Sequence, residues 1–277
     1  MITRAQLIGQ IKQKKSFLCV GLDTDIEKIP EHLRSHPTPV LEFNKQIIDA
    51  TKDLCVAYKP NSAFYESNGV PGLQSLIATW KYLPKNCLNI IDAKRGDIGN
   101  TSDKYAQAFF DEQASGMSFD AITVSPYMGS DSITPYLKYE GKWVIILALT
   151  SSAGSRDFQY LNTDEGYLYE SIIKKANTWA GADRLMYVVG ATKSTEFTTI
   201  RQYAPDNFLL VPGVGAQGGS LEEVCRYGMT KDCGLLVNAS RSIIYASGGK
   251  DFADAARAEA LKIQQMMEVE LVKAGVI

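Results

Sequence analysis

The sequence predicts an α/β protein, a single (β/α)8 TIM barrel that spans residues 1–277. Eight short apolar runs, rich in β-branched residues, alternate with turn residues and longer segments of helical period. The runs are continuous rather than alternating, as expected for parallel strands buried on both faces. Eight strands alternating with helices over roughly 250 residues are typical of this barrel, whereas a doubly wound open sheet, the structural alternative, usually has fewer strands.

The expected strands follow one another without a linker or a shift in composition that would divide the chain. Turn residues follow the runs, for example Asp23 after the first, Ser125 after the fourth and Gly190 after the sixth. In order, we expect strands at residues 17–22, 54–59, 88–92, 121–124, 143–149, 185–189, 209–212 and 234–238.

The expected helices lie between these strands. Residues 39–52 carry Val40, Phe43, Ile47 and Ile48 at helical spacing, 73–82 follow a Pro-Gly pair, and 101–114 begin in a cluster of capping residues. The remaining helices are expected at residues 131–139, 166–180, 194–203, 220–227 and 251–274.

Composition excludes several classes of protein. The chain has 29 Lys and Arg against 31 Asp and Glu, a net charge of −2, with 45% hydrophobic and 22% charged residues. These values exclude a disordered tail, a collagen-like fibre and a coiled coil. The longest apolar run, residues 143–149, is too short to span a membrane, and the N-terminus has no signal-peptide stretch. We therefore expect a cytoplasmic protein that acts on a small molecule and binds neither nucleic acid nor membrane.

The cysteines and histidines offer little chemistry. Five widely spaced cysteines contain no CxxC pair, so we expect them to be structural and buried. His32 and His36 have the i, i+4 spacing of a metal pair, but the prolines around them favour an exposed loop. Without another histidine, neither a His-ligated metal nor a Ser-His-Asp triad can be built.

Charged residues follow the first three strands. Asp23 follows the first, Lys59 ends the second, and Asp92, Lys94 and Asp97 end the third. In such barrels the carboxyl ends of the strands carry the active site, so these charges of alternating sign should meet at one mouth. Asp92 and Lys94 are two residues apart and should project to the same side. A structural ion-pair network on the barrel rim is the alternative.

A glycine-rich segment, PGVGAQGG, follows the seventh strand and leads into a helix. Glycines there expose backbone N–H groups, and the loops after strands seven and eight often hold phosphate. Arg241 follows the eighth strand, and its guanidinium suits phosphate oxygens. The pattern predicts a phosphate site, with a flexible connector as the alternative.

The segment DAKRGDIGNT resembles the D-x-K-x-x-D-I-x-x-T motif of the orotidine 5′-monophosphate decarboxylase family. LCVGLD, YKP, PGVGAQGG and RSI are also similar to that family, in the same order along residues 17–245. The chain's length and TVSPYMG resemble the longer bacterial branch. One departure is TSSA at residues 150–153, where longer members often have TSNP.

The resemblance implies decarboxylation of orotidine 5′-monophosphate to uridine 5′-monophosphate, the last step of de novo pyrimidine nucleotide synthesis, without metal or cofactor. It implies a homodimer in which Asp97 and Thr101 reach into the neighbouring site. The implied catalytic residues are Lys94, Asp92, Asp97 and Lys59, and the implied substrate-binding residues are Asp23, Thr101, Ser151, Pro212, Gln217 and Arg241. Lys94 would stabilise a carbanion at C6 of the pyrimidine and then protonate it.

Three other functions stay open from the residues alone. One is another phosphate-binding barrel enzyme of the same superfamily, which would use magnesium. A second is a Schiff-base aldolase built on Lys94 or Lys59, although flanking carboxylates should keep Lys94 protonated. The third is a non-catalytic sensor of phosphoribosyl ligands.

Overall fold

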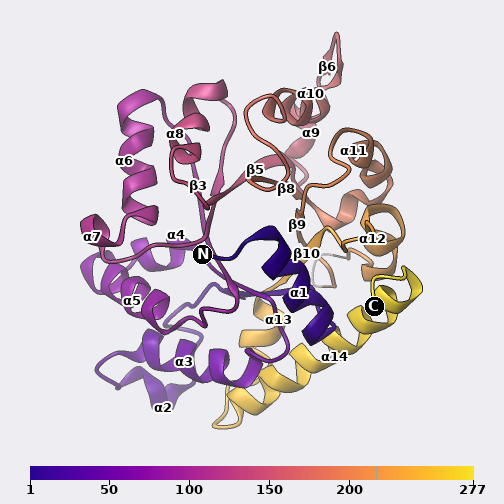
Figure 1. Cartoon of the computed structure of the whole chain (residues 1–277). Coiled ribbons are helices and arrows are strands. Elements are labelled where there is room, and N and C mark those ends of the chain that lie inside the picture. Colours follow the sequence, from indigo (N-terminus) through magenta and orange to yellow (C-terminus); the bar gives the residue numbers. More distant parts are fainter. Residues whose placement is uncertain (216–217) are drawn as a thin grey trace.

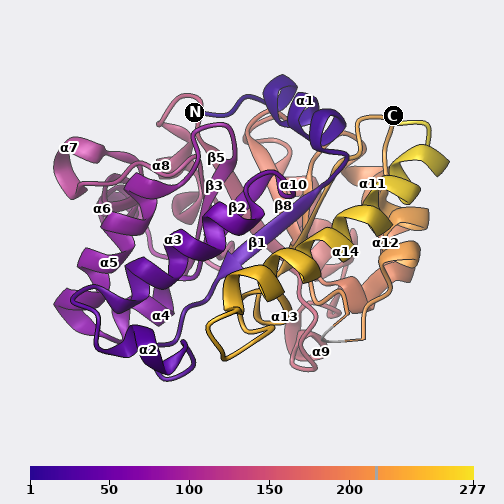
Figure 2. The same ribbon diagram turned by 90° about the horizontal axis from the view of Figure 1, so that it is seen from below.

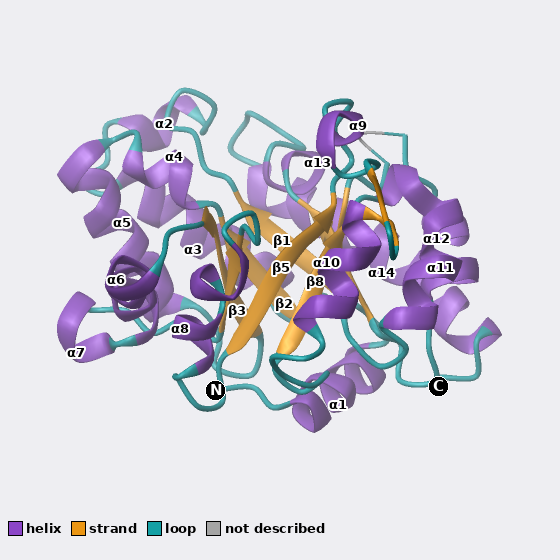
Figure 3. Ribbon diagram, turned by 90° about the horizontal axis from the view of Figure 1, so that it is seen from above, coloured by secondary structure: helices purple, strands orange, loops and turns teal. Residues whose placement is uncertain are grey.

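The computed structural model describes residues 1–215 and 218–277. A closed barrel of eight parallel strands forms its centre, in the order β1-β10-β9-β8-β5-β4-β3-β2, with helices around it (Figures 1 and 3). The ring closes where β1 pairs with β10, Leu18 opposite Val237. The predicted (β/α)8 barrel is therefore confirmed. Its strands are β1 Leu18–Leu22, β2 Ala57–Pro60, β3 Leu88–Arg95, β4 Ala121–Val124, β5 Trp143–Leu149, β8 Leu185–Val189, β9 Leu209–Pro212 and β10 Leu235–Ala239.

The hydrophobic core lies inside the barrel and between the barrel strands and the surrounding helices. Every residue of β1, β2, β4 and β8 is buried, which explains why these runs are almost entirely apolar. The sequence predicted the bounds of β4, β5, β8 and β9 as observed. The polar exceptions within the strands, such as Lys59, Asp92 and Thr123, are the side chains that form the site described below.

Helix α1 (Arg4–Lys14) covers the barrel end where the strands begin (Figure 2). The helix starts at Thr3, whose side chain and that of Gln6 cap each other's backbone N–H groups. Leu7 and Ile11 of α1 are fully buried. Figure 2 shows α1 at the opposite end of the barrel from α9 (Ser155–Phe158) and α13 (Arg241–Ile244). The carboxyl ends of the strands are thus the end available for a site.

Each predicted segment contains a helix. The remaining helices of the structure are α2 Glu31–Arg34, α3 Pro39–Thr51, α4 Ser62–Glu66, α5 Gly69–Tyr82, α6 Gly99–Phe110, α7 Glu112–Ser115, α8 Thr134–Leu137, α10 Leu168–Ala176, α11 Phe197–Tyr203, α12 Leu221–Gly228 and α14 Phe252–Lys273, with 3-10 turns η1 Gly129–Ser132 and η2 Ala191–Glu196. Helices α1, α2, α4, α9 and α13 were not predicted. The prediction for 73–82 was short, because Pro71 fits in the first turn of α5, where no N–H is required. Those for 131–139 and 194–203 merged a 3-10 turn with an α-helix.

Two other predicted helices were wrong in detail. Residues 101–114 form two helices because Asp111 is extended and its side chain caps α7 through the backbone N–H groups of Gln113 and Ala114. Residues 166–180 begin with a strand: β6 (Asn162–Thr163) and β7 (Gly166–Tyr167) form a small hairpin before α10. Gly166 has φ +112°, a conformation that starts no helix.

The cysteines and histidines lie largely as expected. All five cysteines are free thiols and buried, which confirms the expected burial. His36 is exposed, but His32 lies in the single-turn helix α2 rather than in a loop, because Pro30 fits directly before a first helical turn. Among residues 1–215 and 218–277, no helix is both long and apolar enough to cross a bilayer.

Candidate active site

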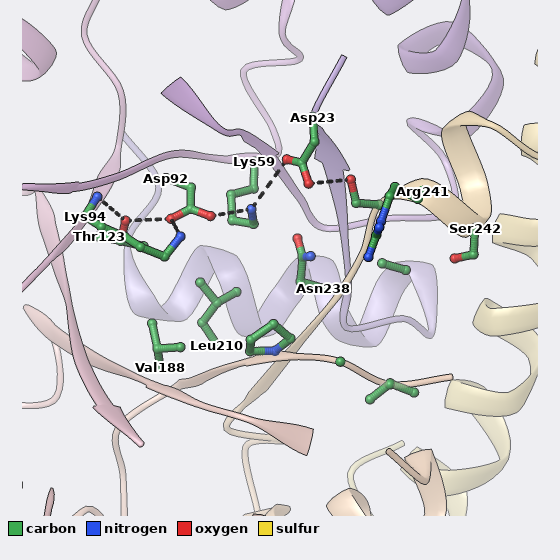
Figure 4. A pocket seen from close by; sticks show the side chains of 15 residues that line it. Asp23, Lys59, Asp92, Lys94, Thr123, Val188, Leu210, Asn238, Arg241 and Ser242 are labelled. Atoms are coloured by element: carbon green, nitrogen blue, oxygen red, sulfur yellow. Dashed lines mark hydrogen bonds and ion pairs between the residues drawn. The ribbon is translucent and has the colours of Figure 1, made fainter. Parts of the chain in front are cut away.

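A pocket opens at the carboxyl ends of the barrel strands. Seven of the eight strands, or the residues directly after them, contribute side chains to it; Figure 4 shows how these lie. The pocket is lined by Asp23, Lys59, Asp92, Lys94, Thr123, Val188, Leu210, Pro212, Gly213, Val214, Asn238, Ala239, Ser240, Arg241 and Ser242. Six of the predicted site residues are among them: Asp23, Lys59, Asp92, Lys94, Pro212 and Arg241.

The carboxylate of Asp92 is at the centre of the charged groups. Its Oδ2 accepts a hydrogen bond from Lys59 Nζ at 2.8 Å. Its Oδ1 accepts from Lys94 Nζ at 2.6 Å and from the Thr123 hydroxyl at 2.8 Å. Asp92 is only 8% exposed. Three donors on two oxygens therefore fix both the position and the plane of this buried carboxylate.

Asp23 continues the row of charges beyond Lys59. Its Oδ1 lies 3.9 Å from Lys59 Nζ, and its Oδ2 accepts a hydrogen bond of 2.8 Å from the Ser240 hydroxyl. Ser240 lies so close to Gly21 that a Cβ on the glycine would come within 2.7 Å of the serine Cβ. Gly21 is therefore the residue that lets β1 and the end of β10 approach closely enough for this contact.

The electrostatics hold Lys59 and Asp92 each in a single ionisation state. Burial by itself lowers the pKa of the Lys59 ammonium, but the charges of Asp92 and Asp23 outweigh burial and raise that pKa above its usual range. Burial by itself raises the pKa of the Asp92 carboxyl, but Lys59 and Lys94 outweigh it and hold that pKa well below its usual range. Asp92 is an anion and Lys59 a cation throughout the neutral range.

Lys94 differs from Lys59 in its exposure. The Lys94 side chain is 49% exposed, whereas that of Lys59 is 5% exposed. Lys94 thus presents an ammonium to the pocket, and the hydrogen bond to Asp92 holds this ammonium in place. Such a group can stabilise negative charge that develops on a bound molecule and can give it a proton.

Arg241 provides positive charge at the other end of the row (Figure 4). Within the described part of the chain, no side chain accepts a hydrogen bond from its guanidinium or forms an ion pair with it. Gly213 and Val214, at the start of the glycine-rich loop after β9, line the same region. A guanidinium that has no such partner among the described residues, at a pocket lined also by the start of a glycine-rich loop, is suited to the oxygens of a phosphate.

Three other predicted site residues, Asp97, Thr101 and Ser151, do not line this pocket. Asp97 lies in the loop after β3, and its Oδ1 accepts a hydrogen bond from the backbone of Ile98. Thr101 is exposed in the first turn of α6, and Ser151 is half-buried in the loop after β5. Gln217 lies outside the described residues. The TSSA segment forms a turn in which the Thr150 and Ser152 hydroxyls are 2.9 Å apart.

Sequence reasoning missed several residues of the pocket. Ser240 and Asn238 belong to the NASRS segment that ends the eighth strand, so their position was a usable signal. Asn238 Oδ1 is buried and has no hydrogen-bond partner within the described residues. Thr123, in the apolar run of the fourth strand, gave no signal of its own. Within the same residues, no group of three or more His, Cys, Asp or Glu side chains could hold a metal ion.

Comparison with known proteins connects this geometry to a family. Residues 16–258 match the family described as Orotidine 5′-phosphate decarboxylase / HUMPS family. The Orotidine 5′-phosphate decarboxylase of Bacteroides fragilis is 56% identical over 274 residues, 98% of each chain. The structure of Leishmania donovani OMP decarboxylase has a TM-score of 0.77 at 34% identity and covers 95% of this chain and 99% of that one.

A longer protein matches as well. The structure of Leishmania donovani UMP synthase has a TM-score of 0.80 at 36% identity over 95% of this chain, which spans 57% of that protein. The curated relative, by contrast, is covered almost from end to end. The match over most of the chain and the identity of 56% lead to one conclusion: this chain belongs to the orotidine 5′-phosphate decarboxylase / HUMPS family.

Proposed function

We propose that the chain decarboxylates orotidine 5′-monophosphate to uridine 5′-monophosphate, the last step of de novo pyrimidine nucleotide synthesis. The observation that carries the proposal is the pocket's central contact: a buried Asp92 carboxylate held between Lys59 and Lys94. Family membership and the name of the 56% identical relative support the same reaction.

Lys94 performs the central step of the proposed mechanism. The bond between C6 of the pyrimidine and the carboxylate carbon breaks, CO2 leaves, and the electron pair remains on C6 in the plane of the ring. The Lys94 ammonium stabilises this carbanion and transfers one proton from Nζ to C6. The neutral amine then regains a proton from water. Lys94 serves because it is the exposed member of the pair of lysines around Asp92.

Asp92 acts by position. Three hydrogen bonds prevent its carboxylate from turning away from the pocket. A substrate carboxylate beside it is repelled, and the repulsion ends when CO2 departs. Asp92 also keeps the Lys94 ammonium in place before the proton moves.

The phosphate end supplies binding energy far from C6. Arg241 forms the charged half of the phosphate site, and backbone N–H groups at Gly213 and Val214 form the other half. Asp23, oriented by Ser240, binds ribose hydroxyls between the two ends. Gln217 bridges base and phosphate, and Ser151 reads the edge of the pyrimidine. Contacts at the phosphate help to assemble the site and to exclude water from it. These contacts themselves stay the same during the reaction.

We further propose a homodimer with shared sites, working in the cytoplasm. Asp97 and Thr101 lie on the β3–α6 segment but outside the pocket of their own chain. Large apolar side chains are exposed nearby, on the loops after the neighbouring strands β3 and β4: Ile98 is 50% and Tyr127 86% exposed. When a second copy of the chain covers these loops, the exposed side chains become buried. Asp97 and Thr101 of each chain then reach the site of the other chain. Five free cysteines accord with a reducing compartment.

The test is turnover by purified protein treated with a chelator. We expect the ultraviolet absorbance of orotidine 5′-monophosphate to fall as CO2 is released, at the same rate before and after chelation. No turnover of this substrate would overturn the proposal. Activity that returns only when magnesium is added would instead indicate a magnesium-dependent member of the family, and borohydride trapping of an aldehyde would indicate a Schiff-base enzyme.

A further inference from the structure

The pairing of β3 with β4 is irregular at the pocket. Ile91 lies opposite Ile122, and the next pair is Arg95 opposite Val124. Three residues of β3, numbers 92–94, therefore face one residue of β4, Thr123. An insertion of this kind leaves backbone groups of the longer strand without partners in the ladder.

The Thr123 side chain fills this gap. The backbone N–H of Lys94 donates to Thr123 Oγ1 at 3.0 Å in place of a ladder hydrogen bond. Lys94 has φ +47°, in the left-handed region that side-chain-bearing residues rarely adopt. Such a conformation persists only where surrounding contacts hold it. Thr123 is 1% exposed, and its hydrogen bond to the Lys94 N–H is one of the contacts that hold this conformation.

The same hydroxyl determines the orientation of Asp92. Because Thr123 Oγ1 accepts from the Lys94 N–H, its own proton is directed to its other neighbour, Asp92 Oδ1, at 2.8 Å. That oxygen also receives the Lys94 ammonium at 2.6 Å. One hydroxyl thus connects the backbone of Lys94 with the carboxylate that holds its side chain, as Figure 4 shows.

We propose that Thr123 is a positioning residue for decarboxylation, which fixes Asp92 and the backbone of Lys94 in their reactive arrangement. This inference rests on the proposed function. Both hydrogen-bonding directions of the hydroxyl are already used within the protein. Its removal should therefore change the placement of Lys94 against C6 and leave substrate affinity largely intact.

Two substitutions separate the hydroxyl from the rest of the side chain. Thr123→Val keeps the shape and removes the hydroxyl, and Thr123→Ser keeps the hydroxyl and removes a methyl group. We expect Thr123→Val to lower kcat by about 10²-fold, the effect of a reacting group misplaced by about 1 Å, with KM close to wild type. Thr123→Ser should retain most of the wild-type kcat.

A matched control is available at Thr51, a buried threonine of α3 whose hydroxyl contacts Ile47 O and the Tyr58 hydroxyl, away from the pocket. Thr51→Val should lower the unfolding midpoint and leave kcat unchanged. Amide hydrogen exchange across residues 88–98 gives a readout independent of activity. Exchange at Lys94 should accelerate in Thr123→Val and stay near wild type in Thr123→Ser.

Several results would overturn the inference. These are a wild-type kcat in Thr123→Val, equal losses of kcat in the valine and serine variants, or unchanged exchange at Lys94. If Thr123→Val does not fold, the serine variant decides, because a large loss of its kcat contradicts the proposal. If the wild-type protein itself does not turn over the nucleotide, the proposed function fails, and the exchange measurement still tests the contact.

Discussion

Asp92→Asn removes the anion between two lysines, and its effect on stability follows from burial. The Lys59 side chain is 5% exposed, and after the substitution its remaining counter-charge among the described residues is Asp23, 3.9 Å away. Removing one partner of a buried ion pair costs about 3–5 kcal/mol, because the other charge stays buried. Asparagine keeps an oxygen that can accept a hydrogen bond, so we expect about 3 kcal/mol, the lower end of that range.

The matched control is Asp53→Asn. Asp53 forms a two-pronged pair with Arg257 on the surface, and their side chains are 55% and 43% exposed. A pair of this kind contributes about 0–1 kcal/mol. Urea unfolding at pH 7 should therefore give a much lower midpoint for Asp92→Asn and a nearly unchanged midpoint for Asp53→Asn, with similar slopes.

The effect of Asp92→Asn on stability should depend on pH. The pKa of Asp92 is lowered in the folded protein, so its ionised form contributes stability that is fully present above the unfolded pKa of about 4. That contribution is lost as the pH falls through the lower folded pKa. The difference between wild type and Asp92→Asn should be constant from pH 5 to pH 8, roughly the neutral range, and shrink below about pH 4. Equal midpoints at pH 7, or a difference that grows in acid, would refute this reasoning.

Two further predictions concern the substrate and the partner chain. Arg241→Ala should weaken binding of uridine 5′-monophosphate at least 10²-fold, since two charge-assisted hydrogen bonds contribute about 1.5–3 kcal/mol each. Calorimetry should find that Arg241→Ala binds uridine like wild type and that the control Arg257→Ala binds the nucleotide like wild type. Equal losses of affinity for nucleoside and nucleotide would exclude a phosphate contact. Mixing inactive Lys94→Ala and Asp97→Asn homodimers should restore about a quarter of the wild-type activity, because half the dimers are then mixed and each has one intact site. No gain, with subunit exchange verified by mass, would mean that Asp97 acts within its own chain.

The barrel was predictable because its strands are buried on both faces. Continuous apolar runs such as 121–124 and 143–149 leave little choice of structure, and their bounds agree with β4 and β5. The β6–β7 hairpin was missed because two-residue strands bury nothing and leave no pattern. The division of 101–114 depends on the extended backbone of Asp111, which a helical periodicity hides.

The site was predictable in part for a similar reason. Carboxyl ends of parallel strands meet at one edge, so Asp23, Lys59 and Asp92 could be placed together from their positions alone. The role of Thr123 depends on how β3 shifts against β4, which no single strand reveals. Asp97 was expected at the same edge, but it lies in the loop after β3 and outside this pocket, since the end of a strand does not determine where the following loop leads.

The central claim is that the Lys94 ammonium, held by Asp92, carries out the decarboxylation. The most direct measurement is the turnover of orotidine 5′-monophosphate by Lys94→Ala beside wild type, with calorimetric binding of uridine 5′-monophosphate as the companion measurement. Lys262→Ala, at an exposed lysine of α14 paired with Glu259, is the matched control. We predict that Lys94→Ala loses at least about 10²–10³ in kcat while it still binds the product, and that Lys262→Ala keeps the wild-type rate. Near wild-type turnover by Lys94→Ala would contradict the account.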